Sequence, residues 1–221
     1  MKKICVIDYD SGNIKSVYNA LRMVLVGSKN SIVVSSEKEK IKEASHIILP
    51  GVGSFNTCIE GLKKKKILNI LEEKVFKSCE PFLGICVGMQ MLATKGYENG
   101  EFFGLNWVKG EVRKINTHKQ KLKIPHMGWN SLKFLKYNSF VKKLINKINT
   151  GNCDEINAYF VHSYNFKLKY PSEKILTTNY GEEITAMISK ENIIGTQFHP
   201  EKSHYFGLAF LQTFIENGEF E

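Results

Sequence analysis

The stretch FLGICVGMQM at residues 82–91 decides how the rest of the chain is interpreted. It begins as an apolar run typical of a buried strand, passes through Gly84, Cys86 and Gly88, and continues as the start of a helix. The pattern Gly-x-nucleophile-x-Gly at a strand-to-helix corner is that of a nucleophile elbow, whose glycines permit the tight turn that lifts the nucleophile out of the strand. A lone buried cysteine is more often a small core residue. The paired glycines instead favour a reactive role for Cys86.

On the N-terminal side of this corner, β-branched runs alternate with segments of helical spacing. Strands are expected at 3–8, 31–35, 46–51 and 81–86, and helices at 14–24, near 56–77 and at 88–94. This alternation predicts parallel βαβ units of an α/β fold. Active sites in such sheets gather at the carboxyl ends of the strands.

On the C-terminal side, from about residue 102, strands follow strands. The runs GEVRKI, NSLKFL, NAYFVHSYNFKL and EITAMISKENIIGTQFHP are separated by turn residues, with little helix before 204–216. We therefore expect a mixed sheet with an antiparallel-rich C-terminal half and a hairpin turn at SKEN, residues 189–192. With 221 residues and no repeat or linker, residues 1–221 are expected to form one domain.

Composition and charge exclude several classes of protein. Hydrophobic residues at 43% and charged residues at 24% are typical of a folded chain. The formal charge of +9 would suit nucleic acid, phosphorylated substrates or an acidic partner, but the lysines are scattered. The one real cluster, KKKK at 63–66, lies between apolar positions and is interpreted as the solvated face of an amphipathic helix.

Cysteine usage and the N-terminus indicate the compartment. The five cysteines, at positions 5, 58, 79, 86 and 153, contain no CxxC pair, so neither a disulfide framework nor a zinc site is expected. The first apolar stretch ends at Asp8, which is too short for a signal peptide, and no run approaches a membrane span. A cytoplasmic protein without membrane contact is predicted.

A base for the thiol is found in QFHPEKS, residues 197–203. On an extended strand end, His199 and Glu201 would project to the same side, and Pro200 between them disfavours helix. One imidazole nitrogen could then meet Cys86 while the other is oriented by Glu201. A structural histidine is the alternative for His199 taken alone; the combination with the elbow favours catalysis.

The glycine-rich loop PGVGSF at 50–55 follows the strand at 46–51. Its backbone N–H groups could form half of an oxyanion hole, the other half being the N–H of Val87 after the nucleophile. The loop lacks the Lys-Ser/Thr ending of a P-loop, which argues against nucleotide binding.

Six ordered motifs carry a family resemblance over nearly the whole chain. LPGVGSF, PFLGICVGMQML and GTQFHPEKS resemble the class I, triad-type glutamine amidotransferases. IDYDSGNIKSV, PHMGWN and YFVHSY are similar to the glutaminase subunits of imidazole glycerol phosphate synthases. The resemblance implies a flavodoxin-like, three-layer fold with a mixed, mostly parallel central sheet.

The resemblance also implies roles for particular residues, with no metal or organic cofactor. Cys86, His199 and Glu201 would form the Cys-His-Glu triad, and backbone groups of Val52, Gly53 and Val87 the oxyanion hole. Glutamine would be held by Gly53, Gln90, His162, Ser163 and Tyr164. Val87 stands where the family usually has Leu, a difference of little weight for a backbone N–H.

A partner is implied because free ammonia would be protonated and lost in water. In the resembling enzymes the partner is a (β/α)₈-barrel cyclase subunit, joined as a heterodimer with a buried ammonia channel; no nucleic acid is involved. The contact would include His126, Met127, Trp129 and Asn130, although core packing is the alternative for Trp129. The segment 132–156 carries no recognisable motif.

Three other hypotheses remain open at this point. A paralogous glutaminase could supply ammonia to a sugar-modifying amidotransferase of surface-glycan biosynthesis. A Cys-His hydrolase or peptidase of similar fold could act without a partner, which PGVG, Gln90 and PHMGWN argue against. A non-catalytic binding module is disfavoured because all three triad residues are present.

Overall fold

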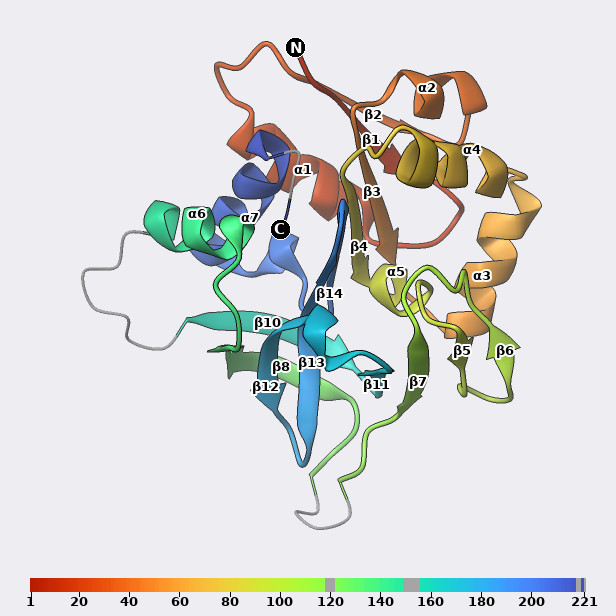
Figure 1. Cartoon of the computed structure of the whole chain (residues 1–221), viewed down its shortest axis with the longest axis vertical. Coiled ribbons are helices and arrows are strands. Elements are labelled where there is room, and N and C mark those ends of the chain that lie inside the picture. Colours follow the sequence, from red (N-terminus) through yellow and green to blue (C-terminus); the bar gives the residue numbers. More distant parts are fainter. Residues whose placement is uncertain (118–121, 149–155, 218–219, 221) are drawn as a thin grey trace.

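The computed structural model describes residues 1–117, 122–148, 156–217 and 220, and an eight-stranded mixed sheet forms its centre (Figure 1). The strands, in spatial order, are β2 (Ser31–Ser35), β1 (Lys3–Ile7), β3 (His46–Gly51), β4 (Phe82–Cys86), β14 (Ile193–Thr196), β13 (Glu183–Lys190), β12 (Lys174–Asn179) and β9 (Lys133–Phe134). From β2 to β14 the neighbours are parallel, and from β14 to β9 they are antiparallel. The predicted change along the sequence, from strands that alternate with helices to strands that follow one another, thus corresponds to a change from parallel to antiparallel pairing within one sheet.

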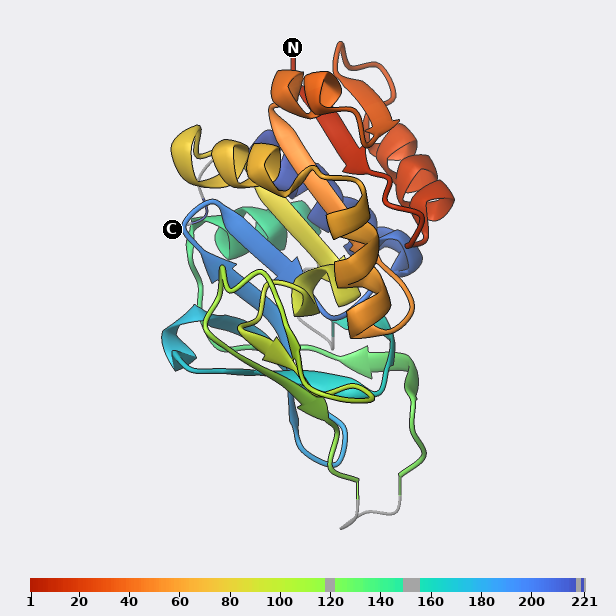
Figure 2. The ribbon, with the colours of Figure 1, turned by 90° about the vertical axis from the view of Figure 1, so that its right-hand side faces the viewer.

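Helices cover both faces of the parallel strands (Figures 1 and 2). On one face α1 (Ile14–Val24) and α6 (Ser139–Ile148) both contact α7 (His204–Glu216). The other face carries α2 (Lys38–Glu43), α3 (Phe55–Lys64) and α4 (Leu68–Glu72), which Figure 2 shows in front of the sheet. Burial on both faces explains why β3 and β4 are continuous apolar runs. The expected three-layer α/β fold is confirmed.

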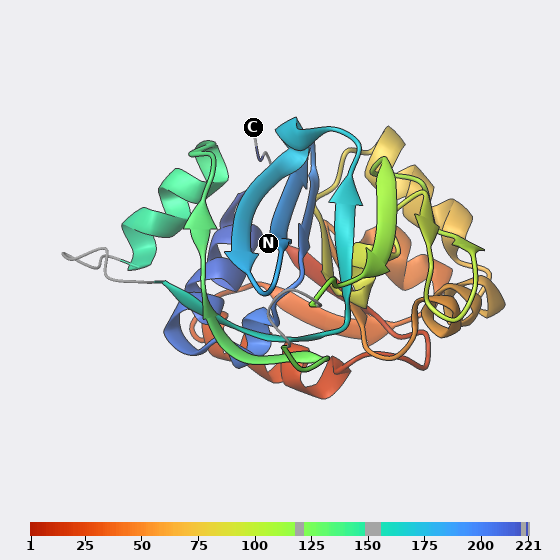
Figure 3. The same cartoon turned by 90° about the horizontal axis from the view of Figure 1, so that it is seen from below.

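Two smaller sheets flank the carboxyl ends of the parallel strands. One contains β11 (Tyr164–Leu168), β7 (Gly110–Lys114), β5 (Lys95–Gly96) and β6 (Phe102–Phe103), and the other pairs β10 (Asn157–His162) with β8 (His126–Ser131). The β8–β10 ribbon lies beside α7 and the short 3₁₀ helix η3 (Pro200–Lys202), as the view from below shows (Figure 3). A second 3₁₀ turn, η2 (Pro171–Glu173), precedes β12.

Two expected helices differ from those observed. The helix expected near 56–77 is divided, because Lys66 adopts a left-handed φ of 54° between α3 and α4, and it ends in a π-helical turn, η1 (Glu73–Lys77). The helix expected at 88–94 is a single turn, α5 (Val87–Gln90).

Helix α6 lies inside the segment 132–156, for which no element was predicted. Its buried residues, Phe140, Val141, Leu144 and Ile148, follow a helical spacing that was present in the sequence. The predicted hairpin is confirmed: Lys190 pairs with Ile193 across a two-residue turn whose first residue, Glu191, has a φ of 52°.

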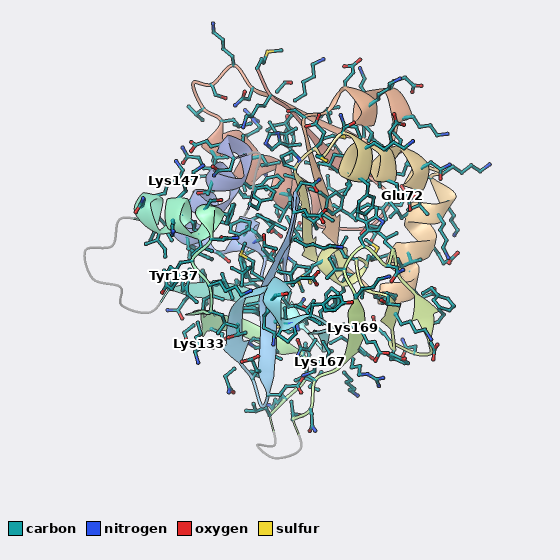
Figure 4. The ribbon with its side chains drawn as sticks, in the orientation of Figure 1. Glu72, Lys133, Tyr137, Lys147, Lys167 and Lys169 are labelled. Atoms are coloured by element: carbon teal, nitrogen blue, oxygen red, sulfur yellow. The ribbon has the colours of Figure 1, made fainter. Side chains whose placement is uncertain are left out.

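The positive charge is spread over the molecule. Figure 4 shows Lys133, Lys147 and Lys167 on separate elements, with Lys169 close to Lys167 just beyond the end of β11. Two of them are neutralised locally, since Lys147 pairs with Glu216 at 2.7 Å and Lys167 with a carboxylate at 2.9 Å. Within the described part of the chain, no helix has the length and apolar character needed to cross a membrane.

Candidate active site

Cys86 ends strand β4 in a strained backbone conformation. Its φ of 55° and ψ of −111° are rare for a residue with a side chain. The flanking glycines are sterically required: a Cβ on Gly84 would lie 2.8 Å from the carbonyl oxygen of Gly88, and a Cβ on Gly88 would lie 1.9 Å from that of Leu49. The turn therefore has the geometry of the predicted elbow. Because α5 is only one turn long, its dipole adds less to the site than the expected longer helix would.

His199 reaches Cys86 because β14 and β4 are parallel neighbours. Thr196 pairs with Ile85, so the chain leaves both strands at the same edge of the sheet. The backbone of His199 is then fixed by two hydrogen bonds. Its N–H donates to the backbone carbonyl of Tyr159 at 2.9 Å, and the Ser203 hydroxyl donates to the His199 carbonyl at 2.7 Å.

The expectation that His199 and Glu201 share an extended strand end is wrong. Residues Pro200–Lys202 form the 3₁₀ helix η3, which begins directly after the extended His199. A proline in the first turn is compatible with a helix, because its missing N–H has no partner to lose there. The helical turn nevertheless brings the two side chains together, with His199 Nδ1 2.8 Å from Glu201 Oε1.

The His199–Glu201 pair is almost fully buried, with side chains 2% and 1% exposed. Asn13, at the start of α1, also donates to Glu201 Oε1 at 3.4 Å. Burial disfavours the imidazolium, but the Cys86 sulfur and the Glu201 carboxylate outweigh that effect and raise the pKa of His199 to about 10. The other nitrogen, Nε2, is buried without a hydrogen-bond partner. It is the ring nitrogen available for proton exchange with Cys86.

Most of the predicted site residues line one cavity of about 280 Å³. Those on its wall are Val52, Gly53, Cys86, Val87, Gln90, His162, Ser163, Tyr164 and His199. Glu201 lies outside the wall, behind His199. The wall also includes Glu98 and Lys202, which sequence reasoning did not single out. Glu98 accepts a hydrogen bond from the N–H of Phe55 at 2.6 Å. Because the two residues are far apart in the sequence, no local pattern predicts this interaction.

Gln197 is a further residue that sequence reasoning missed, although it stands in the QFHPEKS motif. It is fully buried and donates through Nε2 to the Cys86 sulfur at 3.6 Å. Its Oε1 accepts from Gln90 Nε2 at 2.9 Å, and Gln90 Nε2 also donates to the Tyr164 carbonyl at 3.2 Å. Gln90 is therefore anchored to the wall by its amide nitrogen, and it also supports the residue that contacts the thiol.

The glycine-rich loop at 50–53 is held from behind by side chains. Tyr9 donates to the Pro50 carbonyl at 2.7 Å. Ser11 donates to the Val52 carbonyl at 2.6 Å, and Cys58 approaches the same oxygen at 3.6 Å. Because a peptide is planar and trans, fixing the carbonyl of Val52 also fixes the N–H of the next residue on the opposite side. None of these three side chains was predicted.

The four residues expected at a partner contact do not share one environment. Met127 is 62% exposed and Trp129 48% exposed, and Trp129 stacks on His204 of α7 with ring centroids 4.8 Å apart. Asn130 is half-buried. His126 is only 2% exposed, so its side chain is not available on the surface as expected. Strand alternation explains the difference, because residues 127 and 129 point to the opposite face from residue 126.

No group of metal-ligating side chains stands out: among the residues described, no three His, Cys, Asp or Glu side chains are placed to hold a metal ion. The described cysteines, at positions 5, 58, 79 and 86, are free, while Cys153 lies outside the described residues.

The sequence matches known proteins along nearly its whole length. The family model of class-I glutamine amidotransferases matches residues 5–216. The chain belongs to the HisH family of these amidotransferases. It is 40% identical to the imidazole glycerol phosphate synthase subunit HisH of Pelagibacter ubique over 96% of this chain and 98% of that one. It is 42% identical to that of Rhodospirillum rubrum, with the same coverages.

Solved structures agree on the fold of this HisH-family chain. PurLQS from Thermotoga maritima superposes with a TM-score of 0.69 at 19% identity, over 98% of this chain and 99% of that one. A structure described as a glutamine amidotransferase gives a TM-score of 0.67 at 16% identity, with coverages of 95% and 98%. At such identities the likeness concerns the fold alone.

Proposed function

We propose that this chain hydrolyses glutamine to glutamate and ammonia and passes the ammonia to the cyclase subunit of imidazole glycerol phosphate synthase, in histidine biosynthesis. The HisH relatives, which match along nearly their full lengths, support the pathway. The observation that carries the chemistry is Cys86, held at a strained elbow beside the buried His199–Glu201 pair. Residues 1–221 would act as one glutaminase domain in the cytoplasm.

In the proposed mechanism the Cys86 thiolate attacks the side-chain carboxamide of glutamine. His199 carries the proton in the resting state, in accord with its raised pKa, and delivers it from Nε2 to the departing ammonia. The glutamyl thioester that remains is hydrolysed by a water molecule from which His199 takes a proton. Glu201 keeps Nδ1 protonated and orients the ring.

The oxyanion that forms during attack needs backbone donors. The N–H of Val87 follows the nucleophile directly, and Val52 and Gly53 lie on the same cavity wall. The loop that carries them is clamped by Ser11 and Cys58 through the Val52 carbonyl. A loop held by two side-chain bonds can rest in one orientation and turn when the partner docks, which would couple glutamine hydrolysis to the presence of an ammonia acceptor.

Glutamine binding is assigned to the remaining cavity wall. Gln90 and residues 162–164 would contact the amino-acid end of the substrate, with the backbone of Gly53 beside it. Glu98 contributes a carboxylate to this wall and suits the substrate ammonium group. The chemistry of these groups requires no metal or organic cofactor.

The ammonia is proposed to leave through a channel toward a barrel-shaped partner in a heterodimer. Met127 and Trp129 offer exposed apolar surface on β8, next to the strand that lines the cavity. A half-exposed tryptophan backed by His204 is typical of residues that anchor interfaces.

The test is replacement of the nucleophile. Cys86→Ala should abolish glutamine-dependent synthesis in the complex, by about 10⁴-fold or more, while synthesis from added ammonium continues, because the acceptor site lies on the partner. Affinity labelling by a glutamine analogue should fall on Cys86 and spare the buried Cys5 and Cys58. Glutaminase turnover that survives Cys86→Ala would refute the proposal, and stimulation only by a sugar-amidating synthase would reassign the partner.

A further inference from the structure

Two histidines buried between the β8–β10 ribbon and the glutamine cavity form a chain of hydrogen bonds with one possible direction. Asn130 Nδ2 lies 3.1 Å from His126 Nε2, His126 Nδ1 lies 2.9 Å from His162 Nε2, and His162 Nδ1 lies 2.8 Å from the Tyr164 carbonyl. A carbonyl only accepts, so His162 Nδ1 carries its proton. His162 Nε2 must then accept from His126 Nδ1, and His126 Nε2 from Asn130.

The orientation of the Asn130 amide is fixed independently of the histidines. Its nitrogen also donates to the Asn179 carbonyl at 2.9 Å, and its oxygen accepts from the N–H of Ser131 at 2.9 Å. If the nitrogen and oxygen of the Asn130 amide changed places, the oxygen would face the Asn179 carbonyl and the nitrogen would face the N–H of Ser131. Every hydrogen-bonding atom in the chain therefore has a single consistent role.

The hydrogen-bond chain ends on the cavity wall at the Tyr164 carbonyl, an acceptor that the active site also uses. The Tyr164 carbonyl also receives Gln90 Nε2, and Gln90 in turn supports Gln197, which donates to the Cys86 sulfur. An unbroken set of contacts thus runs from the half-buried Asn130 on β8 to the nucleophile.

We propose that His126 is a positioning residue for glutamine: it holds His162 and, through it, the Tyr164 carbonyl and Gln90 in the geometry that binds substrate. The inference rests on the proposed glutaminase function and assigns His126 to the cavity rather than to the partner contact. Its ring is stacked between Phe160, at a centroid distance of 4.8 Å, and Tyr180, at 4.1 Å. Stacking fixes the ring plane, and the two hydrogen bonds fix its rotation.

Neutral rings are a condition of this arrangement, since each imidazole uses one nitrogen as an acceptor. Burial lowers the pKa of His126 to about 4. Burial likewise lowers the pKa of His162 to about 3, with a smaller opposing effect of the bond to Tyr164. Both rings are therefore neutral under physiological conditions, as the hydrogen-bond directions require.

Three substitutions of His126 separate its contacts. His126→Phe keeps the stacking and removes both hydrogen bonds. His126→Asn places an amide nitrogen near the position of Nδ1 and can keep the bond to His162, whereas His126→Gln can keep only the bond from Asn130. Tyr180→Phe is the matched control, because it keeps the stack on His126 and removes only a bond to the Lys123 carbonyl.

Steady-state glutaminase kinetics of the complex should rank these variants. We expect His126→Phe and His126→Gln to lower kcat/KM for glutamine by roughly 10-fold, mainly through a higher KM, with His126→Asn partly restored and Tyr180→Phe unchanged. Synthesis from added ammonium should be unaffected in all four. His126→Phe kinetics equal to those of Tyr180→Phe, or an equal loss of ammonium-dependent synthesis, would overturn the proposal.

Imidazole nitrogen NMR of the unmodified chain gives a readout that does not depend on glutaminase activity. Both His126 and His162 should be neutral and protonated at Nδ1, and His126→Phe should shift the His162 nitrogens. The Nε2-protonated tautomer in either ring would overturn the proposed hydrogen-bond chain through His126 and His162, even in an active enzyme. Conversely, a chain with these tautomers that hydrolyses no glutamine even in the complex with the synthase partner would contradict the proposed function, while the hydrogen-bond chain through His126 and His162 would stand.

Discussion

The charge of Glu201 should set the upper end of the pH range in which the enzyme works. The perturbation is Glu201→Gln, which keeps a side chain of the same length and an oxygen able to accept from His199 Nδ1 but removes the negative charge. In the native site the His199–Glu201 hydrogen bond is 2.8 Å long and both side chains are almost fully buried. Little solvent is available to replace the lost interaction.

The magnitude follows from the type of bond. A hydrogen bond to a charged group contributes about 1.5–3 kcal/mol, and one pKa unit corresponds to about 1.4 kcal/mol. Removal of a charge that raises the pKa must lower it, so the pKa of His199 should fall from about 10 by roughly 1–2 units. The remainder of the elevation comes from the Cys86 sulfur.

The assay is the pH profile of kcat at saturating glutamine, measured on the complex with its synthase partner, because kcat/KM would also fall as the ammonium group of free glutamine loses its proton. Activity needs His199 protonated in the resting enzyme, so its alkaline limb should move from near pH 10 to about pH 8–9 in Glu201→Gln. Asn13→Ala is the control, because it removes a neutral donor from Glu201 and leaves the carboxylate in place. An alkaline limb that stays put or moves upward in Glu201→Gln would refute the assignment of His199 as the titrating group.

Three further outcomes follow from the structure. Gly88→Ala should abolish glutamine turnover, measured as glutamate release, because the new Cβ would lie 1.9 Å from a carbonyl oxygen of β3 and must open the elbow. Stability in urea should fall from pH 6.5 toward pH 4, since burial lowers the pKa values of His46 and His126 to about 4 and that of His162 to about 3. Between these pH values the unfolded chain binds up to three protons that the native chain does not, so the free energy of unfolding should fall by as much as about 4 kcal/mol per pH unit. A urea unfolding midpoint that is constant from pH 7 to pH 4 would contradict this. Trp129→Ala should weaken binding to the cyclase by about 2 kcal/mol in calorimetry, and an unchanged affinity would exclude it as an anchor.

The fold was predictable where local pattern and long-range structure agree. The parallel strands are rich in β-branched and other apolar residues, and the hairpin at 189–192 turns at the position where the apolar run is interrupted. The division of the helix near Lys66 was not predictable, because a left-handed φ is uncommon for lysine and the residue type gives no local signal for it. Helix α6 was not predicted, although its buried residues follow the spacing of an amphipathic helix.

The candidate site was predictable to the extent that its residues belong to compact motifs. Cys86, His199 and Glu201 each lie in one, and their motifs lie at the ends of adjacent strands. The supporting residues come from elsewhere in the sequence. Ser11 donates a hydrogen bond to the Val52 carbonyl in the loop at 50–53, and Asn13 donates one to the Glu201 carboxylate. Such contacts depend on the relative placement of β1, α1 and η3, which composition and periodicity do not specify.

The order of strands in the central sheet has a consequence for protein synthesis. Strand β14 comes last among the described strands of the chain, yet it occupies the place between β4 and β13 and carries the polypeptide to His199. In the proposed mechanism, a nascent chain emerging from the ribosome exposes Cys86 long before His199 exists, and His199 cannot act as its base until strand β14 inserts. Under the proposed mechanism, glutamine hydrolysis is thereby postponed until β14 and the segment that follows it have been synthesised, and chains terminated before His199 are inert rather than wasteful.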